Sequence, residues 1–281
     1  MITMKSAREI ETMRRSGKIT SKVLGDLMRA VKPGMTTRDL DAMAEKGIRD
    51  LGGVPTFMGY HGYPSSICAS VNEEVVHGMP GDRVLQDGDL LSIDIGTTFE
   101  GYVSDTAVTV AVGAISPEAQ RLLNVTQECL MKGIAQMQPG KRLGDIGAAV
   151  QAHAEAAGYG VVRELVGHGI GTKMHEEPQV PNYGTRGAGM ELRPGLVLAI
   201  EPMITQGAYA VSTLKDGWTV VTADGKLAAH FEHTIAITED GPRILTLRDI
   251  GEHADAEQYR PEAAVRQDPG DTLGFKRELV K

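Results

Sequence analysis

The sequence contains an internal repeat, and this feature constrains the fold more than any other. The segment VKPGMTTRDLDAMAEKGIRDLGG, which begins at Val31, resembles MQPGKRLGDIGAAVQAHAEAAGYG, which begins at Met137. Each segment has a Pro-Gly break followed by a helical pattern that ends at glycine. Two units are too few for a solenoid, so the repeat predicts one α+β domain with pseudo-twofold halves that close on one centre. The alternative is chance recurrence of helix, turn and strand signals.

The pattern of apolar residues is the same in both halves: helices come first and strands follow. The predicted helices cover residues 6–31, about 36–51, 117–137 and 143–157. The predicted strand regions are 64–77, a hairpin over 89–112, and the segments 195–204 and 228–238.

Four acidic residues occupy strand positions in otherwise apolar runs. The repeat matches Asp94 with Glu201 and Asp105 with Glu232. A turn centred on residues 99–100 would place Asp94 directly opposite Asp105, with Cβ atoms about 4.5–5.5 Å apart. Carboxylates so close in an apolar sheet repel each other unless they share a proton or a cation. The alternatives are that the acids face water or that one pairs with Arg, although neither strand carries Arg or Lys.

Three histidines extend this candidate site. His168 lies in GHGIG, where the glycines would let the backbone approach a ligand or ion, and it offers one nitrogen donor to a carboxylate-rich site. Two metal ions about 3.5–4 Å apart can bind and activate a bridging water. One imidazole among carboxylates suits Mn, Fe or Co and also admits Zn. His77 and His175 could donate to a scissile carbonyl or hold a leaving nitrogen, and a structural role for each is the alternative.

Composition argues against several classes of protein. A formal net charge of −8 disfavours sequence-independent DNA binding, so we expect no nucleic-acid site. Cys68 and Cys129 form no CxxC pair or disulfide framework, which fits a reducing compartment. The N-terminus lacks the apolar core of a signal peptide, and no stretch approaches the roughly 20 apolar residues of a membrane helix. We therefore expect a cytoplasmic protein without a membrane segment.

A series of motifs resembles type 1 methionine aminopeptidases of the bacterial type, in the order of that family. They are YHGYP (60–64), SVNEEVVHGMP (70–80), IDIG with YVSDTAV, GHGIG (167–171), HEEPQV (175–180), IEPM (200–203), KDGWTV (215–220) and FEHT (231–234). The resemblance covers roughly residues 5–248. It implies the pita-bread fold, in which helices flank a central antiparallel sheet. We therefore expect one catalytic domain over residues 1–250 and a polar C-terminal extension over 251–281.

The resemblance also implies a reaction and the residues that carry it. Members of the family remove the initiator Met from nascent polypeptides, prefer a small second residue, and attack the peptide bond with a metal-bridging water or hydroxide. The implied ligands of two divalent ions are Asp94, Asp105, His168, Glu201 and Glu232. Glu201 would also take a proton from the water, His175 would polarise the scissile carbonyl, and His77 would contact the amide nitrogen of the substrate.

The substrate pocket and the partners are implied in the same way. The pocket would be formed by Tyr60, His61, Tyr63, Cys68, His77, His175 and Trp218. Phe57, Met174 and His230 stand where the family commonly has other residues. Nascent peptides with N-terminal Met are the expected partners, with transient proximity to the ribosome and a monomeric enzyme. An Xaa-Pro peptidase of the same fold and a catalytically inactive binding protein are the alternative functions.

Overall fold

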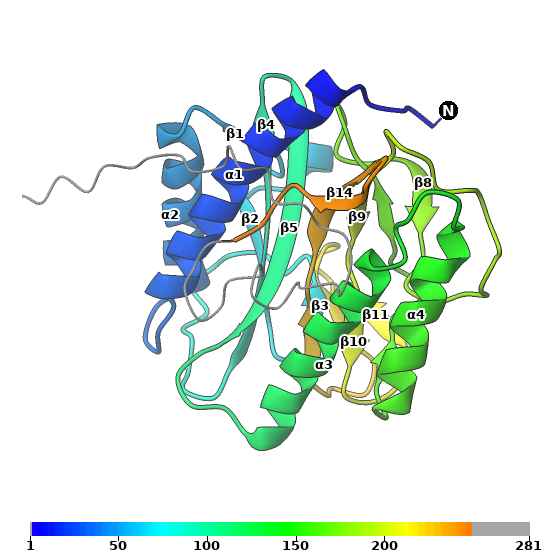
Figure 1. Ribbon diagram of the computed structural model, residues 1–281. Helices are drawn as coiled ribbons and strands as arrows, with labels where there is room; N and C mark the ends of the chain where they lie inside the picture. The colour runs from blue at the N-terminus through cyan, green and yellow to red at the C-terminus, as the bar shows by residue number, and fades with distance from the viewer. Residues whose placement is uncertain (1, 249–281) are drawn as a thin grey trace, which may run out of the picture.

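A computed structural model describes residues 2–248 (Figure 1). The predicted extension over 251–281 lies outside the described residues. In Figure 1 the helices form two pairs, one toward the left and the other toward the lower right of the view. The first pair is α1 (Ala7–Ala30) and α2 (Thr37–Asp50), and the second is α3 (Pro117–Ile134) and α4 (Leu143–Ala156). Among residues 2–248, no helix is long and apolar enough to cross a membrane.

All four predicted helices form, and local side chains explain where they begin. The Ser6 hydroxyl accepts the backbone N–H of Glu9 at the start of α1, and the Glu9 carboxylate accepts the N–H of Ser6. Thr36 and Asp39 form the same capping box at α2. Each box satisfies backbone N–H groups that would otherwise lack partners in the first turn. The third helix ends at Ile134 and not at 137, shortly before Pro139.

The strands form four antiparallel groups. The first group runs β1 (Val54–Pro55), β4 (Leu90–Phe99), β2 (Ile67–Val71), with β5 (Tyr102–Ala111) paired to β4. The second runs β15 (Gly241–Ile244), β14 (His233–Thr238), β9 (Val197–Ile200), β7 (Gly167–Gly169), β8 (Glu176–Val180). The two smaller groups are β13 (Ala228–His230), β10 (Met203–Thr205), β6 (Gly160–Val161), and β11 (Val211–Thr213), β12 (Val220–Thr222), β3 (Glu74–Val76). A short 3-10 helix, η1, covers Tyr60–Gly62.

Strand pairing reproduces the internal repeat. In the first half the order is β5, β4, β2, and in the second half it is β14, β9, β7. The matched sequences LLSIDIG and LVLAIEP therefore occupy the middle strand of each triplet. Buried aliphatic residues of both halves, among them Leu24, Ile93 and Leu198, belong to one continuous core. The predicted pseudo-twofold architecture is thus observed.

Both strand-like segments of the second half are interrupted; the break at Pro202 agrees with its missing N–H, whereas the break at Glu232 was not predicted. The segment 195–204 divides into β9 and β10 at Glu201-Pro202, and 228–238 divides into β13 and β14 at Phe231-Glu232. Pro202 has no N–H to offer a neighbouring strand. The N–H of Glu232 bonds instead to the carbonyl oxygen of Ala107 on β5, at 2.9 Å. Both breaks therefore fall at acidic residues of the candidate site.

Candidate metal centre

The hairpin that carries Asp94 and Asp105 has a different register from the predicted one. Asp94 on β4 lies opposite Ala107, and Asp105 on β5 lies opposite Gly96. The turn residues are Glu100 and Gly101, both with positive φ, as a two-residue type I′ turn requires. This turn is one residue later than predicted, so the two acids are diagonal neighbours. Since the offset is two residues on one strand, both still point to the same face of the sheet.

Hydrogen bonds to β5 position Glu232 of the second half beside Asp105. Besides the Glu232–Ala107 bond, the hydroxyl of Thr106 donates to the carbonyl oxygen of Glu232 at 2.6 Å. Thr234 accepts the N–H of Asp105 at 3.0 Å and donates to its carbonyl oxygen at 2.8 Å. These bonds join the two halves along one seam, and Asp105 and Glu232 lie on it.

His168 has its ring orientation set by a local hydrogen bond. Its Nδ1 lies 2.9 Å from the carbonyl oxygen of Gly169 and therefore donates, which leaves the lone pair on Nε2 free. Nε2 lies 3.5 Å from Oε1 of Glu201 and 4.0 Å from Oδ2 of Asp105. A histidine that binds metal typically donates its other ring N–H in this way.

The glycines beside His168 have a different role from the expected one. A Cβ on Gly167 would lie 2.4 Å from the carbonyl oxygen of Ala199, and one on Gly169 would lie 2.3 Å from that of Glu177. These positions require glycine because β7 lies tightly between β8 and β9, not because a ligand approaches the backbone.

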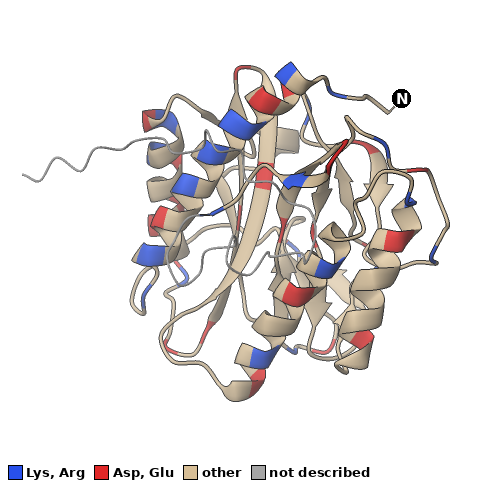
Figure 2. Ribbon diagram, viewed as in Figure 1, with Lys and Arg blue, Asp and Glu red and all other residues tan. Residues whose placement is uncertain are grey.

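The electrostatics of the four acids are those of a cation site. Burial raises the pKa of Asp94 to about 7, and burial together with the Asp94 carboxylate raises the pKa of Asp105 and of Glu201. Burial and then Asp105 raise the pKa of Glu232. Within residues 2–248, none of these carboxylates pairs with Lys or Arg. Figure 2 shows Lys and Arg mainly on helices and loops, whereas acidic positions also occur within the central strands.

Unpartnered oxygen atoms support the same conclusion. Oδ1 of Asp94, Oδ1 of Asp105 and Oε1 of Glu232 are buried without a hydrogen-bond partner among the described residues. Ligand atoms of Asp105, His168 and Glu232 lie within 4.8 Å of one another. Buried carboxylates without partners are strongly unfavourable unless a cation balances them. The donor set therefore fits divalent metal ions.

A cavity of about 250 Å³ opens onto these residues. Its floor contains all five predicted ligands, and its walls contain every residue of the predicted pocket. Tyr63 and Trp218 stack edge to face with ring centres 5.1 Å apart. Phe57 and Met174 also line the cavity. The wall residues are Phe57, Tyr60, His61, Tyr63, Cys68, His77, Met174, His175 and Trp218.

The two remaining predicted histidines face the same cavity. Nδ1 of His175 lies 2.7 Å from the hydroxyl of Tyr60, and the His175 ring lies 4.3 Å from that of His168. Burial lowers the pKa of His77 and of His175, so both imidazoles are favoured in the neutral form. The Tyr60–His175 contact was not predicted, because 115 residues separate the pair and nothing in either local sequence connects them.

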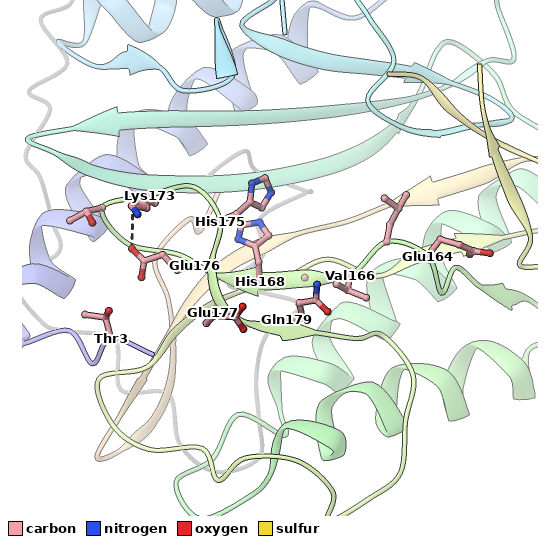
Figure 3. Close-up of a pocket in the computed structure, with 12 residues that line it drawn as sticks. Thr3, Glu164, Val166, His168, Lys173, His175, Glu176, Glu177 and Gln179 are labelled. Atoms are coloured by element: carbon pink, nitrogen blue, oxygen red, sulfur yellow. Dashed lines mark hydrogen bonds between the residues drawn. The ribbon is translucent and has the colours of Figure 1, made fainter. Parts of the chain in front are cut away.

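A second, larger groove of about 640 Å³ adjoins the site (Figure 3). Figure 3 shows His168 and His175 beside each other, with Glu177 and Gln179 on the neighbouring strand. Of the predicted site residues, this groove includes only His168 and His175, so the smaller cavity is the candidate active site. Sequence reasoning gave no role to Lys5. Its Nζ lies 2.7 Å from Oε2 of Glu176, and this ion pair anchors the segment that carries His175.

Comparison with known proteins identifies the family. The model of metallopeptidase family M24 matches residues 11–239. The chain belongs to metallopeptidase family M24. This family works with divalent metal ions, in agreement with the donor set described above.

Individual relatives in the family are methionine aminopeptidases. The chain is 52% identical over 246 residues to methionine aminopeptidase 1 of Bacillus subtilis, which covers 88% of this chain and 99% of that protein. The crystal structure of methionine aminopeptidase from Thermotoga maritima superimposes with a TM-score of 0.87 at 45% identity, covering 89% of this chain and 100% of that one. Prolidase from Pyrococcus furiosus, at 22% identity and a TM-score of 0.72 over 88% of this chain and 66% of that one, shares the pita-bread fold.

Proposed function

We propose that this M24 protein is a methionine aminopeptidase that removes N-terminal Met from nascent polypeptides. The observation that carries the proposal is one cavity in which all five candidate ligands form the floor and the Tyr63–Trp218 pair forms a wall. An aromatic and thiol-lined wall suits an unbranched thioether side chain. The small size of the cavity supports a preference for a small second residue. Relatives that are 52% and 53% identical to this chain are named methionine aminopeptidases, which supports the same function.

We assign the metal ligands to Asp94, Asp105, His168, Glu201 and Glu232, and propose two divalent ions drawn from Co, Mn, Fe or Zn. The unpartnered oxygens of Asp94, Asp105 and Glu232 support this assignment. Such ions supply Lewis acidity and a water that is acidic enough to ionise near neutral pH. The protein contributes the fixed arrangement of donors in the cavity.

The chain's own residues then have separate tasks in the proposed reaction. Glu201, partly buried in the cavity, accepts the proton of the attacking water. His175 donates from Nε2 to the scissile carbonyl oxygen, because a Tyr60 hydroxyl that donates to Nδ1 leaves the ring hydrogen on Nε2. His77 contacts the amide nitrogen of the substrate from the cavity wall.

We further propose that the enzyme acts in the cytoplasm as a monomer, close to the ribosome. The proposed substrate supports this location, because nascent chains carry N-terminal Met as they leave the ribosome.

The experiment that tests the function compares a Met-Ala-Ser peptide with an Ala-Pro peptide. Metal-depleted protein is loaded anaerobically with Mn²⁺, Fe²⁺ or Co²⁺, and release of the first residue is measured. We expect cleavage of the Met peptide with at least one metal. A preference for Ala-Pro would indicate an Xaa-Pro peptidase. Absence of activity with all three metals, in protein shown to be folded and to bind them, would indicate a binding protein.

We predict that His175→Ala lowers kcat by about 10²–10³-fold, the usual cost of losing one donor to a developing oxyanion. Tyr60→Phe, which keeps the imidazole but loses its partner at Nδ1, should cause a smaller loss. Steady-state kinetics with the Met-Ala-Ser peptide measure both. The matched control is His153→Ala on α4, away from the cavity, which should leave kcat unchanged. Wild-type turnover in His175→Ala contradicts the role given to His175.

A further inference from the structure

His230 is a buried histidine near the candidate metal centre that has no role in the mechanism above. It is 1% exposed, and neither ring nitrogen has a hydrogen-bond partner among the described residues. A histidine that served only the core would have at least one ring nitrogen paired, because buried polar groups without partners are unfavourable. The ring nitrogens therefore point to a partner in the adjoining candidate metal centre.

The backbone of His230 is held firmly, so the position of its ring is defined. It is the last residue of β13, where it pairs with Met203 of β10. Thr109 of β5 donates to the carbonyl oxygen of His230 at 2.9 Å and accepts its N–H at 2.8 Å. Because Glu232 follows two residues later on the same segment, the backbone of His230 is fixed relative to the proposed ligands.

The ring faces Glu201. Nε2 of His230 lies 3.8 Å from Oε2 of Glu201, whereas Nε2 of His168 lies 3.5 Å from Oε1. The carboxylate therefore has an imidazole beside each oxygen. His230 itself is not among the residues that line the cavity, so its contact with the site runs through Glu201.

We propose that His230 is a positioning residue for Glu201: its Nε2–H donates to Oε2 and thereby holds Oε1 toward His168 and the metal ions. The inference rests on the metal centre proposed above. A shift of less than 1 Å closes the 3.8 Å gap to hydrogen-bond distance. Partners of this kind orient ligand carboxylates, and their loss typically weakens metal affinity or activity by about 10–100-fold.

The test uses His230→Leu, which removes the donor, and His230→Gln, which keeps an N–H donor at similar reach. Metal-depleted full-length proteins are titrated with MnCl₂ by isothermal titration calorimetry, and kcat and KM for a Met-Ala-Ser peptide are measured at saturating Mn²⁺. We expect His230→Leu to weaken Mn²⁺ binding by about 10–100-fold and to lower kcat with little change in KM. His230→Gln should stay within about threefold of wild type in both.

A structural effect is separated from a positioning effect by thermal unfolding of the metal-free proteins. His230→Leu should unfold at or above the wild-type temperature, because a buried unpaired polar ring is replaced by an apolar side chain. The control Thr126→Val removes a buried hydroxyl bond to Leu122 in α3 and should lower stability without altering Mn²⁺ affinity.

Two results would overturn the inference. One is Mn²⁺ affinity and kcat of His230→Leu within threefold of wild type. The other is His230→Gln as impaired as His230→Leu, since that would make the imidazole itself, and not its donor, the essential group. If wild-type protein binds no Mn²⁺, Fe²⁺ or Co²⁺, the proposed metal centre fails as well, so the two failures are distinguishable.

Discussion

Glu201→Gln is expected to reduce kcat for a Met-Ala-Ser peptide by about 10³-fold or more, because the variant loses both a charged metal ligand and a proton acceptor; general base catalysis alone contributes about 10²–10⁴-fold. The Gln side chain has nearly the same shape, so the fold should be retained. Steady-state kinetics at saturating Mn²⁺ give kcat, and calorimetry on the same samples reports metal occupancy.

The matched control for this variant is Glu164→Gln. Glu164 is an exposed carboxylate of the larger groove beside the site and is absent from the cavity that contains Glu201. Its replacement should leave kcat within about twofold, since exposed charges contribute little. If Glu201→Gln retains wild-type turnover with full metal occupancy, Glu201 is neither the proton acceptor nor an essential ligand.

Asp105→Asn is expected to abolish most of the stabilisation that metal binding gives. At a Mn²⁺ concentration of about 100 times the Kd, the wild type should gain about 2.7 kcal/mol in free energy of unfolding, and the variant should gain almost none. Without metal, the variant should be at least as stable as the wild type, because a buried carboxyl group crowded by three others becomes a neutral amide. Urea unfolding with and without MnCl₂ measures both quantities.

Asp82→Asn is the control for the Asp105 experiment. Asp82 is an exposed acid that pairs with Arg38 at 3.0 Å and does not line the cavity, so its replacement should leave the metal-dependent gain unchanged. A large loss of stability in metal-free Asp105→Asn would mean that the Asp105 carboxylate has a structural partner. An undiminished gain from Mn²⁺ would exclude Asp105 as a ligand.

Much of the fold was predictable because its signals are local. Capping residues such as Ser6 and Thr36, and apolar residues at helical spacing, define the helices within single segments of chain. The internal repeat also predicted a tertiary feature: the matched segments form β4 and β9, and each is the middle strand of a triplet. The strand break at Phe231-Glu232 was missed, because the apolar run continues through it and the competing partner of Glu232 is Ala107, on another strand. The break beside Glu201 has a local signal, since Pro202 has no N–H for a neighbouring strand.

The register of the β4–β5 hairpin depends on two turn residues. The prediction that Asp94 and Asp105 face each other directly was wrong, because Glu100 and Gly101 adopt positive φ and shift the turn by one residue. The shift changes the offset by two positions along one strand, and an even offset keeps side chains on the same face. The metal prediction was therefore insensitive to this error, whereas an odd offset would have separated the two acids.

The sequence by itself determined the α+β class, the two halves and the identity of the candidate ligands, because periodicity, capping and repeated acids can all be read along the chain. Only the tertiary structure decided how those ligands meet. The Thr234–Asp105 bonds and the Thr106–Glu232 bond join residues more than a hundred positions apart. The same is true of Tyr60 against His175. His230 is placed beside Glu201 by a strand pairing and a Thr109 hydroxyl. Such contacts follow from packing two halves against each other, and packing depends on complementary surfaces that no single segment of sequence contains.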